Sequence, residues 1–335
     1  MILKSLAFLM ITASVATAQC DTGEVSIRFE HDAPAVGHPK GEAAAFLAEL
    51  VNNELDGRAC MTVIAESETY SDATVLDGLA SGQYQMAAPA MGNMGDISER
   101  FLIFDLPFLF RDLPVVLDYQ DSPLGRGLLT EEVDKGLMGL AFWADGMKAM
   151  SALAPIESPE DISGMTFGTQ HALIEADYFT ELGAQTLEVP PTRLADALQS
   201  GEVDGQNSTW TDISARGLAY SHDSITETNH GLVQYMLVTS PQFWDSLDAE
   251  LRDDLNLLIE IVTLERNRFA YELANIAQQQ ARQDGLRIVR LDDNTRIEWI
   301  RAMQPTWFRH GGEIGFDQIA AVSYAAQTAT SMFAR

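Results

Sequence analysis

Positive charge is scarce in this sequence. It contains 21 Lys and Arg residues against 49 Asp and Glu residues, which gives a formal net charge of −28 at pH 7. A surface of this sign repels nucleic acid and anionic lipid headgroups. We therefore exclude nucleic acid as a partner. An anionic small molecule stays possible as a ligand, because a binding site sets its own local potential.

The sequence has no apolar run long enough to cross a bilayer, which needs about 20 residues. Its one leader-like segment is an apolar run over residues 6–15, which follows Lys4 and precedes the small residues 16–18. This pattern is typical of a signal peptide, so we expect residues 1–18 to be removed and the remainder to be periplasmic, without stable membrane insertion. The alternatives are a buried structural helix and a lipid anchor on Cys20, for which Gln19 is a poor preceding residue.

Cysteine is nearly absent, with only Cys20 and Cys60 in the chain. Cys20 lies just before the first predicted strand and Cys60 at the start of the second. If these strands are parallel neighbours in an oxidising compartment, the two cysteines come close enough for a disulfide. The alternative is a pair of buried free thiols.

Catalytic signatures are also missing. The sequence has no G-x-S-x-G elbow, no P-loop, no H-E-x-x-H and no G-x-G-x-x-G after its first strand. The six histidines are scattered without metal-ligand spacing, and no carboxylate set has such spacing. We therefore expect neither an enzyme nor a bound metal or cofactor, although dispersed catalytic residues would escape this search.

What the sequence does contain is an alternation of strand and helix patterns. Such alternation favours a parallel α/β sheet, and the length after the leader favours two lobes over a single core. A segment at 230–240 is apolar and long enough to cross between the lobes. The predicted strands cover residues 25–29, 61–65, 84–88, 137–143, 165–167, 187–189, 203–206 and 286–291. The predicted helices cover residues 42–55, 73–79, 173–182, 193–199 (with Thr192 as N-cap) and 248–284.

Ligands of open α/β sheets bind beyond the carboxyl ends of the strands. In this sequence the segments at those ends come from both predicted lobes. We therefore expect a solute to bind in a cleft between the lobes. The segments are 31–32, 90–93, 143–148, 168–171 and 206–210.

Five segments carry a resemblance to a known family. In chain order they are FDLPFLFR at 104–111, GLAFWADG at 139–146, SPEDISGM at 158–165, ALQSGEVDGQ at 197–206 and SPQFWDSL at 240–247. The sequence resembles the DctP-type solute-binding proteins of tripartite ATP-independent periplasmic (TRAP) transporters from about residue 25 to 320. Several landmarks in the correct order are more specific than any one alone.

The resemblance implies a two-lobed α/β periplasmic binding protein fold, type II-like, with a ligand cleft between the lobes and a long helix spanning both. Lobe one would contain residues 19–146 and about 235–270, and lobe two 147–234 and about 271–335. The lobes would close on a small organic solute by a hinge motion and deliver it to the membrane permease subunits of a TRAP transporter. A periplasmic sensor for a membrane receptor and a secreted enzyme on the same scaffold are the competing functions.

The resemblance also implies a ligand site, but with a departure. Relatives hold a carboxylate with an arginine on the first strand of lobe two, and that position is Gly168 here. A second basic position falls on Lys148, and the family's cleft asparagine falls on Ser208, beside Asn207. Three alternatives stay open: Lys148 replaces the arginine with help from Arg193, the ligand has no carboxylate and uses room left by Gly168, or binding is lost.

The remaining candidates for ligand contact are polar or aromatic. Trp143 is either a core residue or part of the cleft wall, and Trp210 is the favoured aromatic contact. Arg193 has the alternative of pairing with Asp196 one turn away. The polar candidates are Asn93, Gln170 and Tyr235.

Overall fold

The computed structural model describes residues 20–169 and 173–323. The strands are β1 (Val25–Glu30), β2 (Ala59–Ile64), β3 (Met86–Ala87), β4 (Met138–Ala152), β5 (Thr166–Thr169), β6 (Gln185–Glu188), β7 (Gly205–Thr209), β8 (Ser224–Glu227), β9 (Leu232–Thr239) and β10 (Arg287–Arg290). The helices are α1 (Pro39–Glu54), α2 (Val75–Ser81), α3 (Leu113–Asp121), α4 (Pro123–Gly127), α5 (Leu173–Glu181), α6 (Leu194–Ser200), α7 (Trp210–Ala215), α8 (Pro241–Ser246), α9 (Ala249–Gln283), α10 (Asp293–Met303) and α11 (Pro305–Ile314). Short 3-10 turns are η1 (Asp72–Thr74), η2 (Met91–Met94), η3 (Glu99–Asp105), η4 (Val133–Lys135), η5 (Pro159–Ile162), η6 (Pro191–Arg193) and η7 (Leu218–Ser221).

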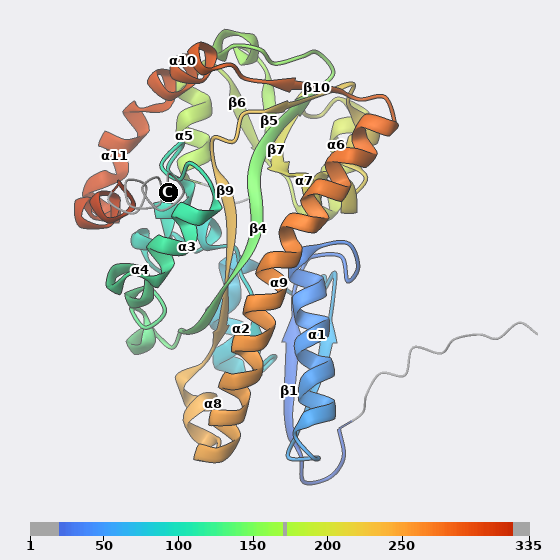
Figure 1. Ribbon diagram of the computed structural model, residues 1–335, viewed down its shortest axis with the longest axis vertical. Helices are drawn as coiled ribbons and strands as arrows, with labels where there is room; N and C mark the ends of the chain where they lie inside the picture. The colour runs from blue at the N-terminus through green and yellow to red at the C-terminus, as the bar shows by residue number, and fades with distance from the viewer. Residues whose placement is uncertain (1–19, 170–172, 324–335) are drawn as a thin grey trace, which may run out of the picture.

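The sheet has two halves that share one strand. In the lower half of Figure 1 the strand order is β2-β1-β3-β9-β4, and in the upper half β4 continues into β7-β5-β6. Strands β1, β2 and β3 are parallel to one another, as are β5, β6 and β7, but β4 and β9 run antiparallel to their neighbours. The α/β class predicted from the sequence is confirmed, whereas the sheet is mixed and not wholly parallel.

Strand β4 connects the halves because it is twice as long as the sequence pattern indicated. The predicted strand stopped at residue 143, before a segment that reads as a turn. The structure continues it to Ala152, and the register against β9 shifts between Ala144 and Gly146. A bulge there absorbs an extra residue without ending the strand. Beyond it, β4 pairs with β7 and β8 of the upper half.

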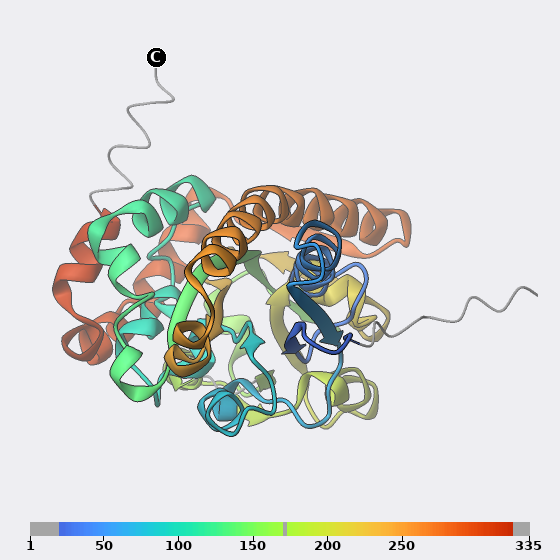
Figure 2. The same ribbon diagram turned by 90° about the horizontal axis from the view of Figure 1, so that it is seen from below.

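Helix α9 runs along the whole molecule beside β4 (Figures 1 and 2). Its 35 residues span about 52 Å at 1.5 Å per residue. The side chain of Asp248 caps it by accepting from the backbone N–H of Leu251 at 2.8 Å, and Gly285 follows its C-terminal end. It packs against α1 at one end and α7 at the other, so the predicted long helix is confirmed. Among residues 20–169 and 173–323, no helix is long and apolar enough to span a membrane.

The apolar interior also reflects the two halves. One buried cluster, with Ile27, Leu47 and Leu237, packs β1, α1 and β9 against the first part of α9. A second, with Trp210 and Ile225, packs beneath the last turns of α9. The largest cluster extends from one half into the other, so the exact lobe boundaries stay a prediction.

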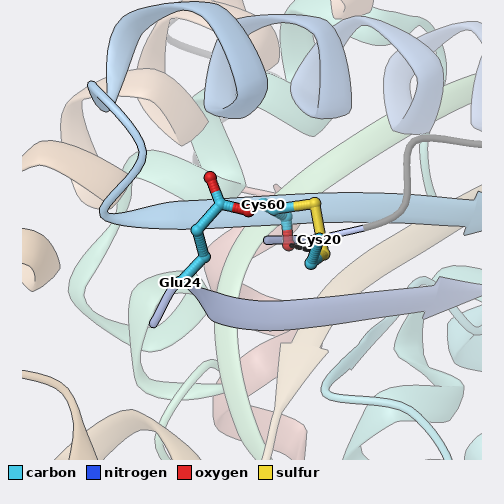
Figure 3. Close-up of side chains that lie close together, drawn as sticks. All are labelled: Cys20, Glu24 and Cys60. Atoms are coloured by element: carbon cyan, nitrogen blue, oxygen red, sulfur yellow. Dashed lines mark hydrogen bonds between the residues drawn. A yellow bond between two sulfur atoms is a disulfide. The ribbon is translucent and has the colours of Figure 1, made fainter. Parts of the chain in front are cut away.

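A disulfide joins Cys20 to Cys60, with their Cα atoms 5.4 Å apart, where β1 and β2 lie side by side (Figure 3). The bridge closes a loop across a sequence separation of 40 residues. In the chain-entropy description such a bridge stabilises the folded state by about 3–4 kcal/mol.

We expect the double variant Cys20→Ser, Cys60→Ser to lose about that free energy of unfolding in guanidinium titrations. A wild-type protein whose midpoint is unaffected by a reducing agent would contradict the prediction.

Candidate functional site

A cleft with an empty volume of about 850 Å³, open solvent at its mouth included, lies between the two halves. Loops that follow β1 and β3 reach it from the lower half, and the ends of β5 and β7 reach it from the upper half, while β9 lines its floor. Polar residues dominate the lining: Asp32, Lys40, Asp72, Asn93 and Asp105 from the lower half, Lys148 of β4, Thr169, Glu175, Asn207, Ser208, Asp212 and Arg216 from the upper half, and Gln234 and Tyr235 of β9.

Lys148 of β4 lies between two carboxylates. Its Nζ is 3.2 Å from Asp105 Oδ1, at the end of η3, and it also forms an ion pair with Glu175 in the first turn of α5. All three side chains are at least nine-tenths buried. Burial opposes ionisation of Lys148, but the two carboxylates outweigh it and raise the pKa of the ammonium group. Lys148 is therefore charged and already paired on both sides.

Lys40 is the second buried cation of the cleft. Its Nζ donates to Asp32 Oδ1 at 2.8 Å and lies 4.2 Å from the ring centroid of Tyr235. The Tyr235 hydroxyl in turn donates to Asp145 at 2.8 Å. Pro39 begins α1 and His38 caps it, which places Lys40 in the first turn, directly facing the end of β1. Burial of Asp32 raises the pKa of its carboxyl group, but the charge of Lys40 outweighs this effect, and the pKa is lowered to about 2.

Arg216 is the third cation and connects the two halves. Its Nε donates to Asp212 Oδ1 at 2.6 Å, one turn back in α7, and its Nη2 donates to the backbone oxygen of Asp32 at 3.4 Å. Asp212 also accepts from Ser208 and lies 3.4 Å from His38 Nε2 of the lower half. The charge of Arg216 and the hydrogen bonds to Asp212 outweigh its burial and lower the pKa of its carboxyl group. Two contacts thus cross the cleft at this point.

Asp72 at the start of η1 is held by neutral groups. It accepts from the Tyr70 hydroxyl at 2.8 Å, from the backbone N–H of Ala90 at 3.0 Å and from the Asn93 amide at 2.9 Å. Burial raises the pKa of this carboxyl group, and the charge of Lys40 only partly offsets the effect.

Two amide side chains of the cleft lining have polar atoms without a hydrogen-bond partner among the described residues. Gln234 is 2 % exposed, and both its amide oxygen and its amide nitrogen are unpartnered. The oxygen of Asn207 is unpartnered too, while its nitrogen donates to the Tyr178 hydroxyl at 2.9 Å. Both residues line the cleft. An unpaired buried polar group costs about 1–3 kcal/mol, so a hydrogen bond from a ligand or a water molecule to these atoms would be favourable.

Gly168 lies at the cleft wall near the end of β5. A Cβ atom there would stand 2.6 Å from Leu194 Cδ1 and 3.4 Å from Val203 Cγ2. The space where an arginine side chain would begin is therefore filled by Leu194. The side chains of Leu194 and Val203 lie against this position, and the expectation that Gly168 leaves room for a bulkier or neutral solute stays a prediction.

The structure brings six of the predicted ligand residues to the cleft: Asn93, Lys148, Gly168, Asn207, Ser208 and Tyr235. Three others lie elsewhere. Trp143 is 1 % exposed and stacks on Phe29 in the core, and Trp210 packs beneath α9. Arg193 points to solvent and pairs with Glu202, not with Asp196, so it stands apart from Lys148. Gln170 lies outside the described residues. The ligand contacts themselves stay predictions.

Several lining residues escaped the sequence analysis. Lys40 lies in the first turn of α1 and Arg216 directly follows α7, and a charged residue in or beside a helix is usually exposed to solvent. Glu175 was missed for the same reason, because it lies within the predicted helix 173–182. Gln234 had a usable signal, because it is an amide side chain among the apolar residues of β9, directly before Tyr235.

The described residues contain one group with the geometry of a metal site, formed by Cys20, Glu24 and Cys60 (Figure 3). Two of its three ligand atoms are the sulfurs of the disulfide. Sulfur in a disulfide is not a thiolate and does not bind metal as one. This group therefore does not fit a metal ion while the bridge is formed.

Two α/β halves joined by β4, a long helix packed along both and a polar cleft at the strand ends define a periplasmic binding protein fold. The model of the family "Bacterial extracellular solute-binding protein, family 7" (DctP) matches residues 29–311. The chain belongs to this family, and the resemblance found in the sequence is confirmed. Members are solute-binding proteins of TRAP transporters, which bind small solutes and work with membrane permease subunits; they are not enzymes.

Curated relatives and solved structures agree with this assignment. The chain is 36% identical to a C4-dicarboxylate-binding periplasmic protein of Vibrio cholerae over 95% of this chain and 96% of that protein. A Rhodobacter capsulatus protein of the same description is 30% identical over 90% and 91%. A TRAP periplasmic solute-binding protein of Shewanella oneidensis with bound succinate superimposes with a TM-score of 0.87, at 31% identity, covering 90% of this chain and 99% of that one.

Proposed function

We propose that the cleft between the two halves binds one small organic solute and encloses it by a hinge motion. The observation that carries the proposal is the unpartnered amide of Gln234 at the floor of a cleft lined from both halves. A solute there gains contacts from both halves only when they are close together, which favours the closed arrangement. The loaded protein then delivers its solute to the permease subunits of a TRAP transporter.

The contacts of Arg216 support this view of closure. Its guanidinium joins Asp212 of the upper half to the backbone of Asp32 in the lower half, beside the cleft.

The solute in several related structures is an organic acid, such as succinate or L-malate. The proposal for this chain is limited to a small organic solute, because Gly168 replaces the arginine that would bind a carboxylate.

The test begins with protein purified from the periplasm without unfolding. Mass spectrometry of the material released by denaturation identifies a retained solute, and calorimetry measures its affinity. We expect Gln234→Ala to weaken binding about tenfold, since it removes two neutral hydrogen-bonding atoms. Gln199→Ala, at an exposed position of α6, serves as the control and should leave the affinity unchanged. Equal affinities for both variants would contradict a role for Gln234.

Export is part of the same proposal. The charge of Lys4, the apolar run at 6–15 and the small residues at 16–18 support removal of a leader. We expect intact mass spectrometry of the periplasmic protein to give a chain that begins at Gln19. Retention of the full-length chain in the cytoplasm would count against it.

A further inference from the structure

The cleft lining contains more carboxylates than cations. Among the described residues that line it, the cations are Lys40, Lys148 and Arg216, and the carboxylates are Asp32, Asp72, Asp105, Glu175 and Asp212. With every group ionised, the lining carries a formal charge of −2. This excess is a property of the cleft and not only of the acidic surface.

Each cation of the lining is already paired with a carboxylate. Lys40 has Asp32 at 2.8 Å, Arg216 has Asp212 at 2.6 Å, and Lys148 has both Asp105 and Glu175. Among the described residues, a dianion that entered this buried site would find no cation that is free of a carboxylate. Burying charge in this way is costly unless a partner neutralises it.

Two of the carboxylates are short of positive charge. Asp72 has neutral hydrogen-bond partners, and Glu175 shares Lys148 with Asp105. Burial raises the pKa of both carboxyl groups. A positive group that entered the cleft would favour their ionised forms and would be attracted by them.

The unpartnered amides supply a second, independent observation. The free oxygen of Asn207 accepts a hydrogen bond, as an ammonium group requires. Gln234 offers both a donor and an acceptor, which suits a carbonyl or a carboxyl group at the other end of a solute. These atoms stay without a protein partner although the residues that carry them line the cleft.

We infer that the cleft selects a small solute that carries a positively charged nitrogen and has a net charge of zero or above, and that it rejects dicarboxylates. An amino acid, a betaine-type zwitterion or an amine has this chemistry. The inference rests on the proposed function, because it assigns a ligand class to the same cleft. It departs from succinate and L-malate, the ligands of related structures.

The first test compares probes of one chain length. Succinate, 4-aminobutanoate and 1,4-diaminobutane are a dianion, a zwitterion and a dication of nearly equal length. They are measured by thermal shift and calorimetry on the mature protein, within a wider panel of dicarboxylates, sugars, amino acids, betaines and amines. A bound ligand raises the melting temperature by mass action, so millimolar binders are visible.

The outcomes separate the inference from the proposed function. Stabilisation confined to solutes with a positive nitrogen supports the inference. If a dicarboxylate gives the largest shift, the inference is overturned while the proposed function stands. If no compound of any charge class stabilises the protein and none is retained on purification, the proposed function fails as well.

The second test changes the charge at one position. Glu175→Gln removes one of the two carboxylates that face Lys148, and the amide preserves the shape of the side chain. We expect the dissociation constant for succinate to fall at least about tenfold, and that of the best nitrogen-bearing solute to rise by a similar factor, as one unit charge close to the ligand implies. Glu160→Gln removes the same formal charge at an exposed position of η5 and should change neither constant. Constants unchanged by Glu175→Gln, or changed in the same direction, would overturn the inference.

Discussion

Replacing Lys148 by alanine is expected to lower the free energy of unfolding by about 3–5 kcal/mol, because it leaves buried carboxylates without their cation. Asp105 and Glu175 are each only 6 % exposed at the side chain, and they approach one another through Lys148. Without the ammonium group, one or both must bind a proton in the folded state. Denaturant titration at pH 7.5 measures the loss.

The pH dependence of this loss follows from its cause. In the variant, the folded-state pKa of the carboxyl groups lies above the unfolded value, so the folded protein binds more protons and loses stability as pH rises between the two values. The penalty should therefore shrink on going from pH 7.5 towards pH 4.5. Arg126→Ala, at an exposed ion pair with Asp121, is the control and should cost less than about 1 kcal/mol. Equal losses for the two variants would show that Lys148 is not buried as described. Stability has to be measured before ligand binding, since an unfolded variant binds nothing for a trivial reason.

Acid is expected to destabilise the wild-type protein steeply below about pH 6.5, because three buried histidines stay neutral in the folded state. Burial lowers the pKa of His31 and of His230 to about 3 and that of His222 to about 4. His230 contacts the Tyr178 and Thr228 hydroxyls, and the charges of Lys148 and Arg296 lower its pKa further.

The sign follows from proton binding. Above pH 6.5 these histidines are neutral in both states, and no free energy is lost. As pH falls from 6.5 towards the folded-state values, only the unfolded chain binds the protons, and each histidine costs about 1.4 kcal/mol per pH unit. The raised pKa values of Asp72 and Glu175 act in the opposite direction and offset part of the loss. Unfolding free energies at pH 7.5, 6.0 and 5.0 give the slope. His230→Gln replaces the imidazole by an uncharged amide and should reduce the slope of unfolding free energy against pH by about 1.4 kcal/mol per pH unit. An unchanged slope would contradict the view that His230 stays neutral in the folded state.

The fold was predictable from the sequence because apolar periodicity and ordered family landmarks are local features. The helix at 248–284 was predicted to within one residue at each end, since Asp248 and Gly285 are strong boundary signals. Strand β4 was predicted at half its length, because a bulge at Gly146 looks like a turn in one dimension. Helices α3, α4, α7, α8, α10 and α11 were not predicted.

The candidate site was predictable only in part. Residues at strand ends, such as Asn207 and Ser208, follow from the position of the strands in the sheet. Charged residues in helices do not, because their direction depends on how the helix packs: Glu175 reaches Lys148 across 27 positions of sequence. Trp210 was expected to contact the ligand, and Trp143 was left open between the core and the cleft wall, but the structure buries both large apolar rings in the core.

The order of strands has a consequence for how the chain assembles. Strand β9 lies between β3 and β4, although it is synthesised long after both. The first half of the molecule therefore has a gap at the centre of its sheet until residues 232–239 arrive, and α9, which covers it, comes later still. No continuous stretch of sequence encodes either half. A truncated chain ending before β9 would expose the edges of β3 and β4, and we expect such a fragment not to form a stable half.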